Sequence, residues 1–581
     1  MKKTQLLWGE PGLRTRLRFP SPRQRLGVRR VRGGGTRRFP GRGFYCGSST
    51  ADAKAVSAPF PASHRTPRPC GQSCGSIMAT LLLLLALSLV PVQAQTSAPP
   101  ATLAELQQRL TEHVTNPRFG AGSLGVKIVS LDTGKTLFEH DAGKLFSPAS
   151  NSKLYTMALA LDKLGGDYRI KTSLYAAAKP DRRGVLKGDL IIYGRGDPTI
   201  NARLNAGDIY RALEPLVAAL TNAGVKRISG DLVGDDSFIH GPPYGSGWAW
   251  DDLENYYGAE ISALTINDNT LQLSVKPGAS NGAPARITLA PATTYLAISN
   301  RVLTVAGGGR PQINVHRPLE ANVLYVTGRM PIEENEFKDD VTMHNPTGLF
   351  VAFFKEALAR HGVKVSGKTR TWNWLDRQVK ARDMSKLVEL GFVESPPMRD
   401  LVREVQKPSQ NLYTDLVLAH IGALEQFREG HWFQTTEDVG IRELRAFVAK
   451  AGVKPGDVQF EEGSGLSRNN LTTPNATIAL LQYMSRHAEA DAYLNALPIA
   501  GVDGTLRNRM KNTPAAGNVR AKTGTLRWAN SLSGHVKTAA GERLIFSVML
   551  NRYVAPDTEH SGRAEIDQIA VMLAGFAGRS E

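Results

Sequence analysis

Residues 147–161 read SPASNSKLYTMALAL, with three serines shortly before one lysine. The apolar run that follows predicts a helix, and residues three apart lie on one face of a helix. Ser150 and Lys153 have this spacing, in the pattern Ser-x-x-Lys. Ser152 points elsewhere, and Ser147 precedes a proline and so lies before the helix. Taken alone, the stretch is better explained as a capped amphipathic helix, because Ser-x-x-Lys arises by chance in long chains.

Two further motifs follow in order along the chain. KPSQNLYTDLVLAH (407–420) places Ser409-Gln410-Asn411, a Ser-x-Asn pattern, directly before a predicted helix. VRAKTGTLRWANSLSGHV (519–536) places Lys522-Thr523-Gly524 inside a strand-like run. The order Ser-x-x-Lys, Ser-x-Asn, Lys-Thr-Gly resembles the signature of penicillin-binding proteins and serine β-lactamases. Each motif alone is weak, but all three in order and in suitable local contexts form a strong signal.

The spacing of the motifs favours one subfamily. Ser409 lies 259 residues after Ser150, so a large insertion must separate the first two motifs. The chain resembles the penicillin-binding protein 4 type of D-alanyl-D-alanine carboxypeptidase/endopeptidase, peptidase family S13. The resemblance spans about residues 100–575. It includes four further stretches: LKGDLIIYGRGDPTI (186–200), GWAWDDL (247–253), GSGLSRNNL (463–471) and GVDGTLRNRM (501–510).

The resemblance implies an α+β fold. Its main part is a penicillin-recognition domain of the serine β-lactamase-like type, with an antiparallel sheet flanked by helices. Two nested β-rich insertion domains interrupt it, and short strand-like runs between Gly, Pro and Asp turns in residues 170–380 independently indicate such inserts. The expected boundaries are 95–176 and 382–581 for the catalytic domain, 177–204 and 275–381 for the first insertion, and 205–274 for the second, nested insertion.

The resemblance also implies catalytic roles. Ser150 would attack the carbonyl between two D-alanines and become acylated, and Lys153 would take its proton. A lysine acts as a base only when neutral, so burial and a nearby cation must lower its pKa. Ser409 would relay a proton to the leaving amine. Backbone N–H groups of Ser150 and Thr525 would form the oxyanion hole.

The remaining motif residues are expected to bind substrate. Asn411 would hold the substrate amide and orient Lys153. Lys522 would attract the terminal carboxylate and keep Lys153 neutral by like-charge repulsion. The Thr523 or Thr525 hydroxyls would bond the same carboxylate, and Gly524 would let the substrate lie close to the strand. The expected partners are peptidoglycan peptides ending in D-Ala-D-Ala, and β-lactams.

Composition narrows the remaining possibilities. The formal charge is +18, but residues 1–78 hold 16 Lys and Arg against Glu10 and Asp52, so the rest is near neutral and no nucleic-acid partner is expected. All three cysteines lie in this N-terminal stretch, which excludes a thiolate zinc site or a cysteine nucleophile in the body. The twelve histidines show no ligand spacing, so no metal or cofactor is expected.

The N-terminal region predicts export. Residues 78–94 contain an apolar run too short to span a bilayer, which needs about 20 residues, and end in the small-residue pattern of a signal peptide. Residues 1–77 are basic, rich in Gly and Pro, and expected to be disordered. Three interpretations of residues 1–77 remain open: a long n-region of the signal peptide, a mis-assigned start codon, or an organelle transit peptide. We expect a periplasmic or secreted protein, with peripheral membrane or cell-wall association left open.

Two alternatives stay beside the carboxypeptidase hypothesis. A class A β-lactamase needs a glutamate for deacylation, typically in Glu-x-x-x-Asn, and no such pattern lies between Asn411 and Lys522. A catalytically silent cell-wall-binding scaffold would be free to lose the motif residues, which are all intact. Both alternatives are therefore disfavoured, and the balance of carboxypeptidase and endopeptidase activity is left undecided.

Overall fold

The computed structural model describes residues 98–379, 383–430 and 433–581. The chain divides into two units, Met1–Ala94 and Gln95–Glu581, and only the second contains described residues. The predicted leader (1–77) and signal peptide (78–94) therefore lie outside the described residues. Within the described part, no helix combines the length and the apolar character that crossing a membrane requires.

A five-stranded sheet forms the centre of the catalytic domain. Its order is β19-β20-β21-β1-β2, and every neighbouring pair is antiparallel. The antiparallel sheet that the resemblance implies is confirmed, and β1 and β2 form a hairpin within it. The strands are β1 (Ser123–Ser130), β2 (Thr136–His140), β19 (Arg520–Leu526), β20 (Ala529–Lys537) and β21 (Arg543–Asn551).

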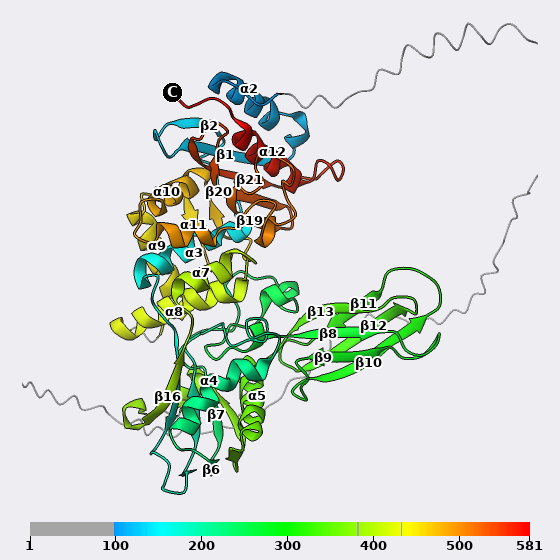
Figure 1. Ribbon diagram of the computed structural model, residues 1–581, viewed down its shortest axis with the longest axis vertical. Helices are drawn as coiled ribbons and strands as arrows, with labels where there is room; N and C mark the ends of the chain where they lie inside the picture. Colours follow the sequence, from blue (N-terminus) through cyan, green and yellow to red (C-terminus); the bar gives the residue numbers. More distant parts are fainter. Residues whose placement is uncertain (1–97, 380–382, 431–432) are drawn as a thin grey trace, which may run out of the picture. The chain divides into compact units, whose positions relative to one another are not determined.

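Helices cover both faces of this sheet because side chains alternate along each strand. Leu544 and Phe546 of β21 pack with α2 and α12, whereas Ile545 between them joins the core on the other side, with α10 (Figure 1). Thr102 caps α2 by accepting from the Glu105 N–H. The helices of the domain are α2 (Leu103–Val114), α3 (Ser152–Leu164), α7 (Met398–Gln406), α8 (Asn411–Glu429), α9 (Thr436–Lys450), α10 (Pro474–Met484), α11 (Ala490–Ala496) and α12 (Gly562–Gly575).

Helix α3 is the buried centre of the helical layer. All ten residues from Ser152 to Leu161 are buried, on every face of the helix. A helix that is apolar all round is stable only inside a core, and α3 packs against α7, α8 and α9. A short 3-10 turn, η2 (Ala149–Asn151), precedes it and carries Ser150. The nucleophile candidate thus stands at the N-terminal end of a rigid element.

The chain leaves and re-enters the catalytic domain through paired strands. β3 (Lys171–Ala176) pairs antiparallel with β16 (Val388–Glu394), and both belong to a second sheet of order β15-β7-β5-β3-β16. A small parallel sheet of order β14-β6-β4 lies in the same insertion. The further elements are β4 (Val185–Leu186), β5 (Leu190–Tyr193), α4 (Ile209–Asn222), β6 (Arg227–Ile228), β7 (Leu232–Asp235), α5 (Pro346–Arg360), β14 (Lys364–Val365), β15 (Thr369–Trp372) and α6 (Trp374–Val379).

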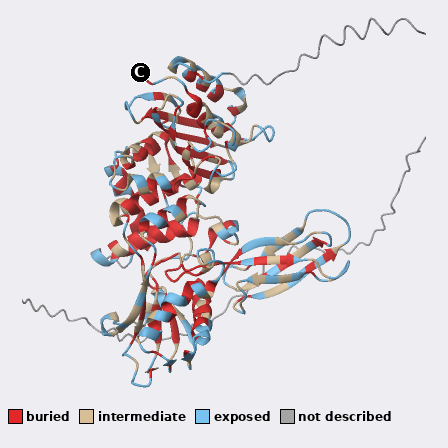
Figure 2. Ribbon diagram, viewed as in Figure 1, coloured by how far each residue is buried: buried red, intermediate tan, exposed pale blue. Residues whose placement is uncertain are grey.

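A pair of three-stranded sheets is nested inside this insertion. One sheet has the order β13-β8-β9 and the other β10-β12-β11. Their inward residues share one core, whereas β9 and β11 alternate between exposed and half-buried positions (Figure 2). The strands are β8 (Thr270–Lys276), β9 (Arg286–Ala290), β10 (Ala297–Val305), β11 (Gln312–His316), β12 (Val323–Pro331) and β13 (Phe337–Thr342).

These pairings differ from the predicted boundaries of the insertions. β7 lies within residues 205–274, expected to form the inner domain, yet it pairs in parallel with β5 and β15 of the outer one. The inner module instead spans β8 to β13. β3 and β16, both expected in the catalytic domain, join the insertion sheet. Hydrophobic periodicity identifies strands but does not name their partners, and parallel partners lie far apart in sequence.

Candidate active site

Of the three serines in residues 147–152, only Ser150 shares a hydrogen bond with Lys153 in the described part of the chain. Nζ of Lys153 lies 3.0 Å from Oγ of Ser150, and Ser150 is half-buried. Ser152 is fully buried, and its hydroxyl accepts from Nδ2 of Asn470. Ser147 lies before the turn and is tied by its backbone to Asn551. The helical spacing predicted from the sequence therefore selected the serine that contacts the lysine.

Lys153 is fully buried and has three fixed partners. Besides Ser150, its Nζ lies 2.6 Å from Oδ1 of Asn411 and 2.6 Å from the carbonyl oxygen of Ser464. Burial lowers the pKa of Lys153 to about 8, against the opposite effect of the Asp415 and Glu462 carboxyls. About a tenth of Lys153 is thus neutral at pH 7, against a far smaller fraction for an ordinary lysine. Burial, rather than the predicted repulsion by a second lysine, is the main cause.

Ser409 and Lys522 form a second pair. Nζ of Lys522 donates to Oγ of Ser409 at 2.7 Å and to the carbonyl of Thr523 at 2.9 Å. Burial, followed by the charge of Lys153, holds the pKa of Lys522 well below its usual value. Ser409 has φ +67°, a left-handed conformation that is uncommon for serine and often marks functional sites.

Asn411 begins α8 and uses both ends of its amide within the protein. Oδ1 accepts from Lys153, and Nδ2 donates to the backbone carbonyl of Tyr257 at 2.9 Å. Tyr257 belongs to η4 (Tyr256–Gly258), in the chain segment of the insertion that also contains GWAWDDL. The predicted orientation of Lys153 by Asn411 agrees with this geometry. The Nδ2 group of Asn411 already donates to Tyr257, so a substrate that binds through this group would have to displace the Tyr257 carbonyl.

Strand β19 presents the Lys-Thr-Gly motif with alternating faces. The hydroxyls of Thr523 and Thr505 lie 2.7 Å apart, and Thr525 is exposed two residues further along the same face. Gly524 faces the other way. A Cβ added there would lie 2.2 Å from Oγ of Ser531 and 2.4 Å from the carbonyl of Pro148. The glycine therefore admits the segment that carries Ser150, and its expected role of letting the substrate lie close to the strand stays a prediction.

Several residues that hold the site together carried no role in the sequence analysis. Asn151, the residue after Ser150, donates to the carbonyl of Lys522 at 3.1 Å and to Oγ of Ser531 at 2.6 Å, so it joins η2 to the sheet. Ser464 lies in the stretch GSGLSRNNL, and Glu462 lies directly before that stretch. That stretch was recognised only by resemblance. No local pattern shows that its residues reach Lys153.

A salt bridge supports the loop behind β19. Nζ of Lys407 lies 2.6 and 2.8 Å from the two carboxylate oxygens of Asp503 and 2.6 Å from the carbonyl of Leu497. Asp503 lies in the stretch GVDGTLRNRM. It joins the segment before Ser409 to the loop that presents Thr505. The pair thereby couples two of the three motif regions.

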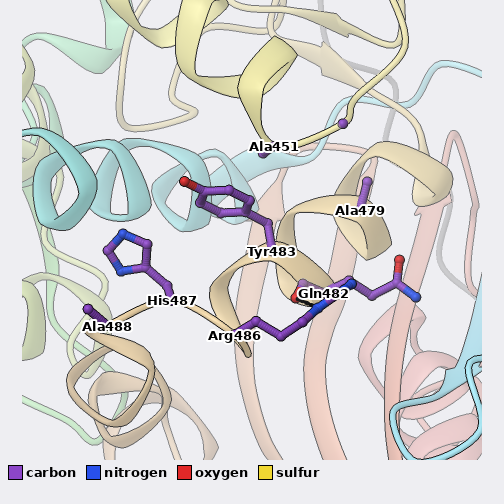
Figure 3. Close-up of a pocket in the computed structure, with 8 residues that line it drawn as sticks. Ala451, Ala479, Gln482, Tyr483, Arg486, His487 and Ala488 are labelled. Carbon is purple, nitrogen blue, oxygen red and sulfur yellow. Dashed lines mark hydrogen bonds between the residues drawn. The ribbon is translucent and has the colours of Figure 1, made fainter.

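A surface hollow elsewhere contains none of the predicted site residues. It has a volume of about 610 Å³ and is lined by residues of α10 and the turns beside it. Tyr483 and His487 lie next to each other there (Figure 3), and both contact Asp162. Among the described residues, no group of three or more His, Cys, Asp or Glu is arranged to hold a metal ion.

Comparison with known proteins identifies the family. The model of the D-Ala-D-Ala carboxypeptidase 3 (S13) family matches residues 106–574. The chain belongs to this family. A D-alanyl-D-alanine carboxypeptidase from Actinomadura sp. (strain R39) is 34% identical over 535 residues, covering 88% of this chain and 93% of that protein. The D-alanyl-D-alanine carboxypeptidase DacB of Haemophilus influenzae is 26% identical, covering 79% and 89%.

A solved structure supports the S13 fold. The crystal structure of penicillin-binding protein 4 from Haemophilus influenzae matches with a TM-score of 0.67 and 25% identity, covering 80% of this chain and 97% of that one. The resemblance predicted from the three motifs is thus confirmed, as are the α+β fold and the assignment to a peptidase family. The chain spans most of the length of these S13 relatives.

Proposed function

We propose that the protein is a serine-type D-Ala-D-Ala carboxypeptidase that acts on peptidoglycan stem peptides through a Ser150 acyl-enzyme. The observation that carries this proposal is the buried Lys153 amine, 3.0 Å from Oγ of Ser150, in an S13 family member. The hydrogen bond between Lys522 and Ser409 supports the proposal as well, because it joins the other two motifs of the family signature.

Acylation begins with proton transfer from Ser150. Neutral Lys153 takes the hydroxyl proton while Oγ forms a bond to the carbonyl carbon between the two D-alanines. Backbone N–H groups of Ser150 and Thr525 stabilise the negative oxygen of the tetrahedral intermediate. Collapse of the intermediate breaks the bond to the leaving nitrogen. That nitrogen receives a proton through Ser409, and water later hydrolyses the ester.

Recognition of the terminal carboxylate is assigned to β19. Lys522 provides a positive charge once a carboxylate approaches, because an anion next to a lysine raises the pKa of its ammonium. The hydroxyl of Thr523 and the exposed hydroxyl of Thr525 lie on one face of the strand and can donate to the same group. A free carboxylate next to the scissile amide is what D-Ala-D-Ala and β-lactams share, so both should acylate Ser150.

Endopeptidase activity is part of the proposal. A peptide cross-link also has a D-alanine carbonyl as acyl donor, and only the leaving amine differs. The same acyl-enzyme therefore forms from either substrate. We also propose a periplasmic or secreted location, because peptidoglycan lies outside the cytoplasm and residues 78–94 have the pattern of a signal peptide.

The proposal is tested by D-alanine release from a synthetic peptide ending in D-Ala-D-Ala. The wild-type protein should release D-alanine and form a stable adduct with a fluorescent penicillin, and Ser150→Ala should do neither. Rapid release of hydrolysed penicillin without cleavage of the peptide would instead indicate a β-lactamase. Absence of both reactions in the folded wild-type protein would indicate a silent scaffold.

A further inference from the structure

Glu462 is a buried acidic residue that the roles above do not use. Its side chain is fully buried, and its oxygens accept hydrogen bonds from the turn that follows it. Oε2 accepts from the N–H of Ser464 at 2.8 Å and from the Ser464 hydroxyl. Oε1 accepts from the N–H of Gly465 at 2.7 Å and from Nδ2 of Asn470 at 2.8 Å. Both oxygens act as acceptors, as in an ionised carboxylate, and residues 463–467 fold around them.

The folded turn brings one backbone carbonyl to Lys153. The carbonyl oxygen of Ser464 and Oδ1 of Asn411 each lie 2.6 Å from Nζ, and Oγ of Ser150 lies 3.0 Å from it. A neutral amine has two N–H bonds and one lone pair. When Ser464 and Asn411 accept the two N–H bonds, the lone pair is left toward the Ser150 hydroxyl.

The turn packs tightly against the segment that carries Ser150. Gly465 has φ +83°, and a Cβ added there would lie 1.9 Å from the carbonyl oxygen of Ala149. The turn therefore packs directly against the residue before Ser150. A change in the conformation of the turn would move the Ser464 carbonyl and also the atoms of Gly465 that pack against η2.

We propose that Glu462 is a positioning residue for the acylation of Ser150. Its carboxylate shapes the 463–467 turn, and the turn aims the Ser464 carbonyl at Lys153. Lys153 is thereby oriented toward the serine that it deprotonates. This inference rests on the proposed function, since it requires Lys153 to be the base.

Three ionisable groups face Lys153 from the elements packed against it: Asp415 of α8, Glu462 of the turn and Lys522 of β19. Burial, followed by the charge of Glu462, holds the pKa of Asp415 well above its usual value, so loss of the Glu462 charge favours ionisation of Asp415. Burial lowers the pKa of Lys153, and the carboxyls oppose that effect. Loss of the Glu462 charge should therefore lower the pKa of Lys153 further.

The test is the pH dependence of acylation by a fluorescent penicillin in Glu462→Gln, which keeps the shape of the side chain and removes its charge. We expect acylation to slow by about tenfold or more, because small misplacements of a catalytic group are costly. The acid limb should move to lower pH. Asp415 can ionise in place of Glu462, so the shift should be larger, about one pH unit, when Asp415→Asn is added.

Two outcomes would overturn the proposal. One is a wild-type rate in Glu462→Gln. The other is a slower enzyme whose acid limb stays at the wild-type position in both variants, because a purely structural role would not change that limb. Glu461→Gln is the matched control: this neighbouring glutamate is exposed and bonds Ser467 and Asn469, so its variant should behave as the wild type.

A second variant distinguishes the effect of the Glu462 charge from the effect of its side-chain length. Glu462→Asp keeps the charge but is one methylene shorter, so it should slow acylation without moving the acid limb to lower pH. Glu462→Asp also tests the proposal if Glu462→Gln fails to fold. A wild-type acylation rate in Glu462→Asp would overturn the proposal. Failure of the wild-type protein to react with penicillin would instead refute the proposed function, before Glu462 is tested.

Discussion

Raising the pH from 6 to 8 should accelerate the acylation of Ser150 by penicillin about fiftyfold. Burial lowers the pKa of Lys153 to about 8 in the folded protein, and only the neutral amine can take the serine proton. A group with this pKa is about 1% neutral at pH 6 and about half neutral at pH 8. The rate should therefore rise steeply through this interval and level off above pH 9.

The assay is the second-order rate constant for labelling by a fluorescent penicillin, measured from pH 6 to 9. A melting curve at each pH verifies that the protein stays folded. Lys153→Arg is the control, because a guanidinium stays protonated throughout this range and should be inactive at every pH. A wild-type rate that is constant between pH 6 and 8, in the folded protein, would refute the assignment of Lys153 as the base.

Three substitutions test how the site is held together. Gly524→Ala should abolish most acylation, by about a hundredfold or more, because its Cβ would meet Ser531 and Pro148; near-normal labelling would contradict the steric argument. Asn151→Ala should cost about 2 kcal/mol in the free energy of unfolding, since it leaves buried partners unsatisfied; an unchanged denaturation midpoint would count against this. Lys407→Met should lower D-alanine release by several-fold and leave the Asp503 loop less stable, measured by kinetics and thermal melting; unchanged values would show that the pair is dispensable.

Local geometry made part of the site predictable from sequence. Ser150 and Lys153 are three residues apart at a helix start, so helical spacing alone brings them together once the helix is assumed. The pattern also placed Ser409 and Asn411 at the start of a helix, and α8 begins at Asn411. The hairpin of β1 and β2 is likewise a local feature, since alternating apolar residues and an intervening turn specify a pairing between segments that are neighbours in sequence.

Long-range contacts were not predictable in this way. Ser464 reaches Lys153 across 311 residues, and its carbonyl carries no sequence signature. Glu462 is buried although acidic residues are usually exposed, because donors of the 463–467 turn and Asn470 satisfy its oxygens. The partners of β7 also had to come from the structure, because short buried strands resemble each other in sequence.

The glycine of the Lys-Thr-Gly motif illustrates the same limit. The sequence shows that position 524 is a glycine on a strand, and close approach of another group is the usual reason. Which group approaches depends on how η2 packs against β19. The structure identifies Pro148 of the nucleophile segment, and this changes the expected effect of substitution from weaker substrate binding to a displaced nucleophile.

The most direct test of the central claim is to locate the penicillin adduct by mass spectrometry. The folded protein is incubated with a penicillin, digested, and the peptide containing residues 147–153 is fragmented. We predict one adduct of the mass of the intact penicillin, attached to Ser150, and none in Ser150→Ala. An adduct on Ser147, Ser152 or a residue outside this segment would contradict the account.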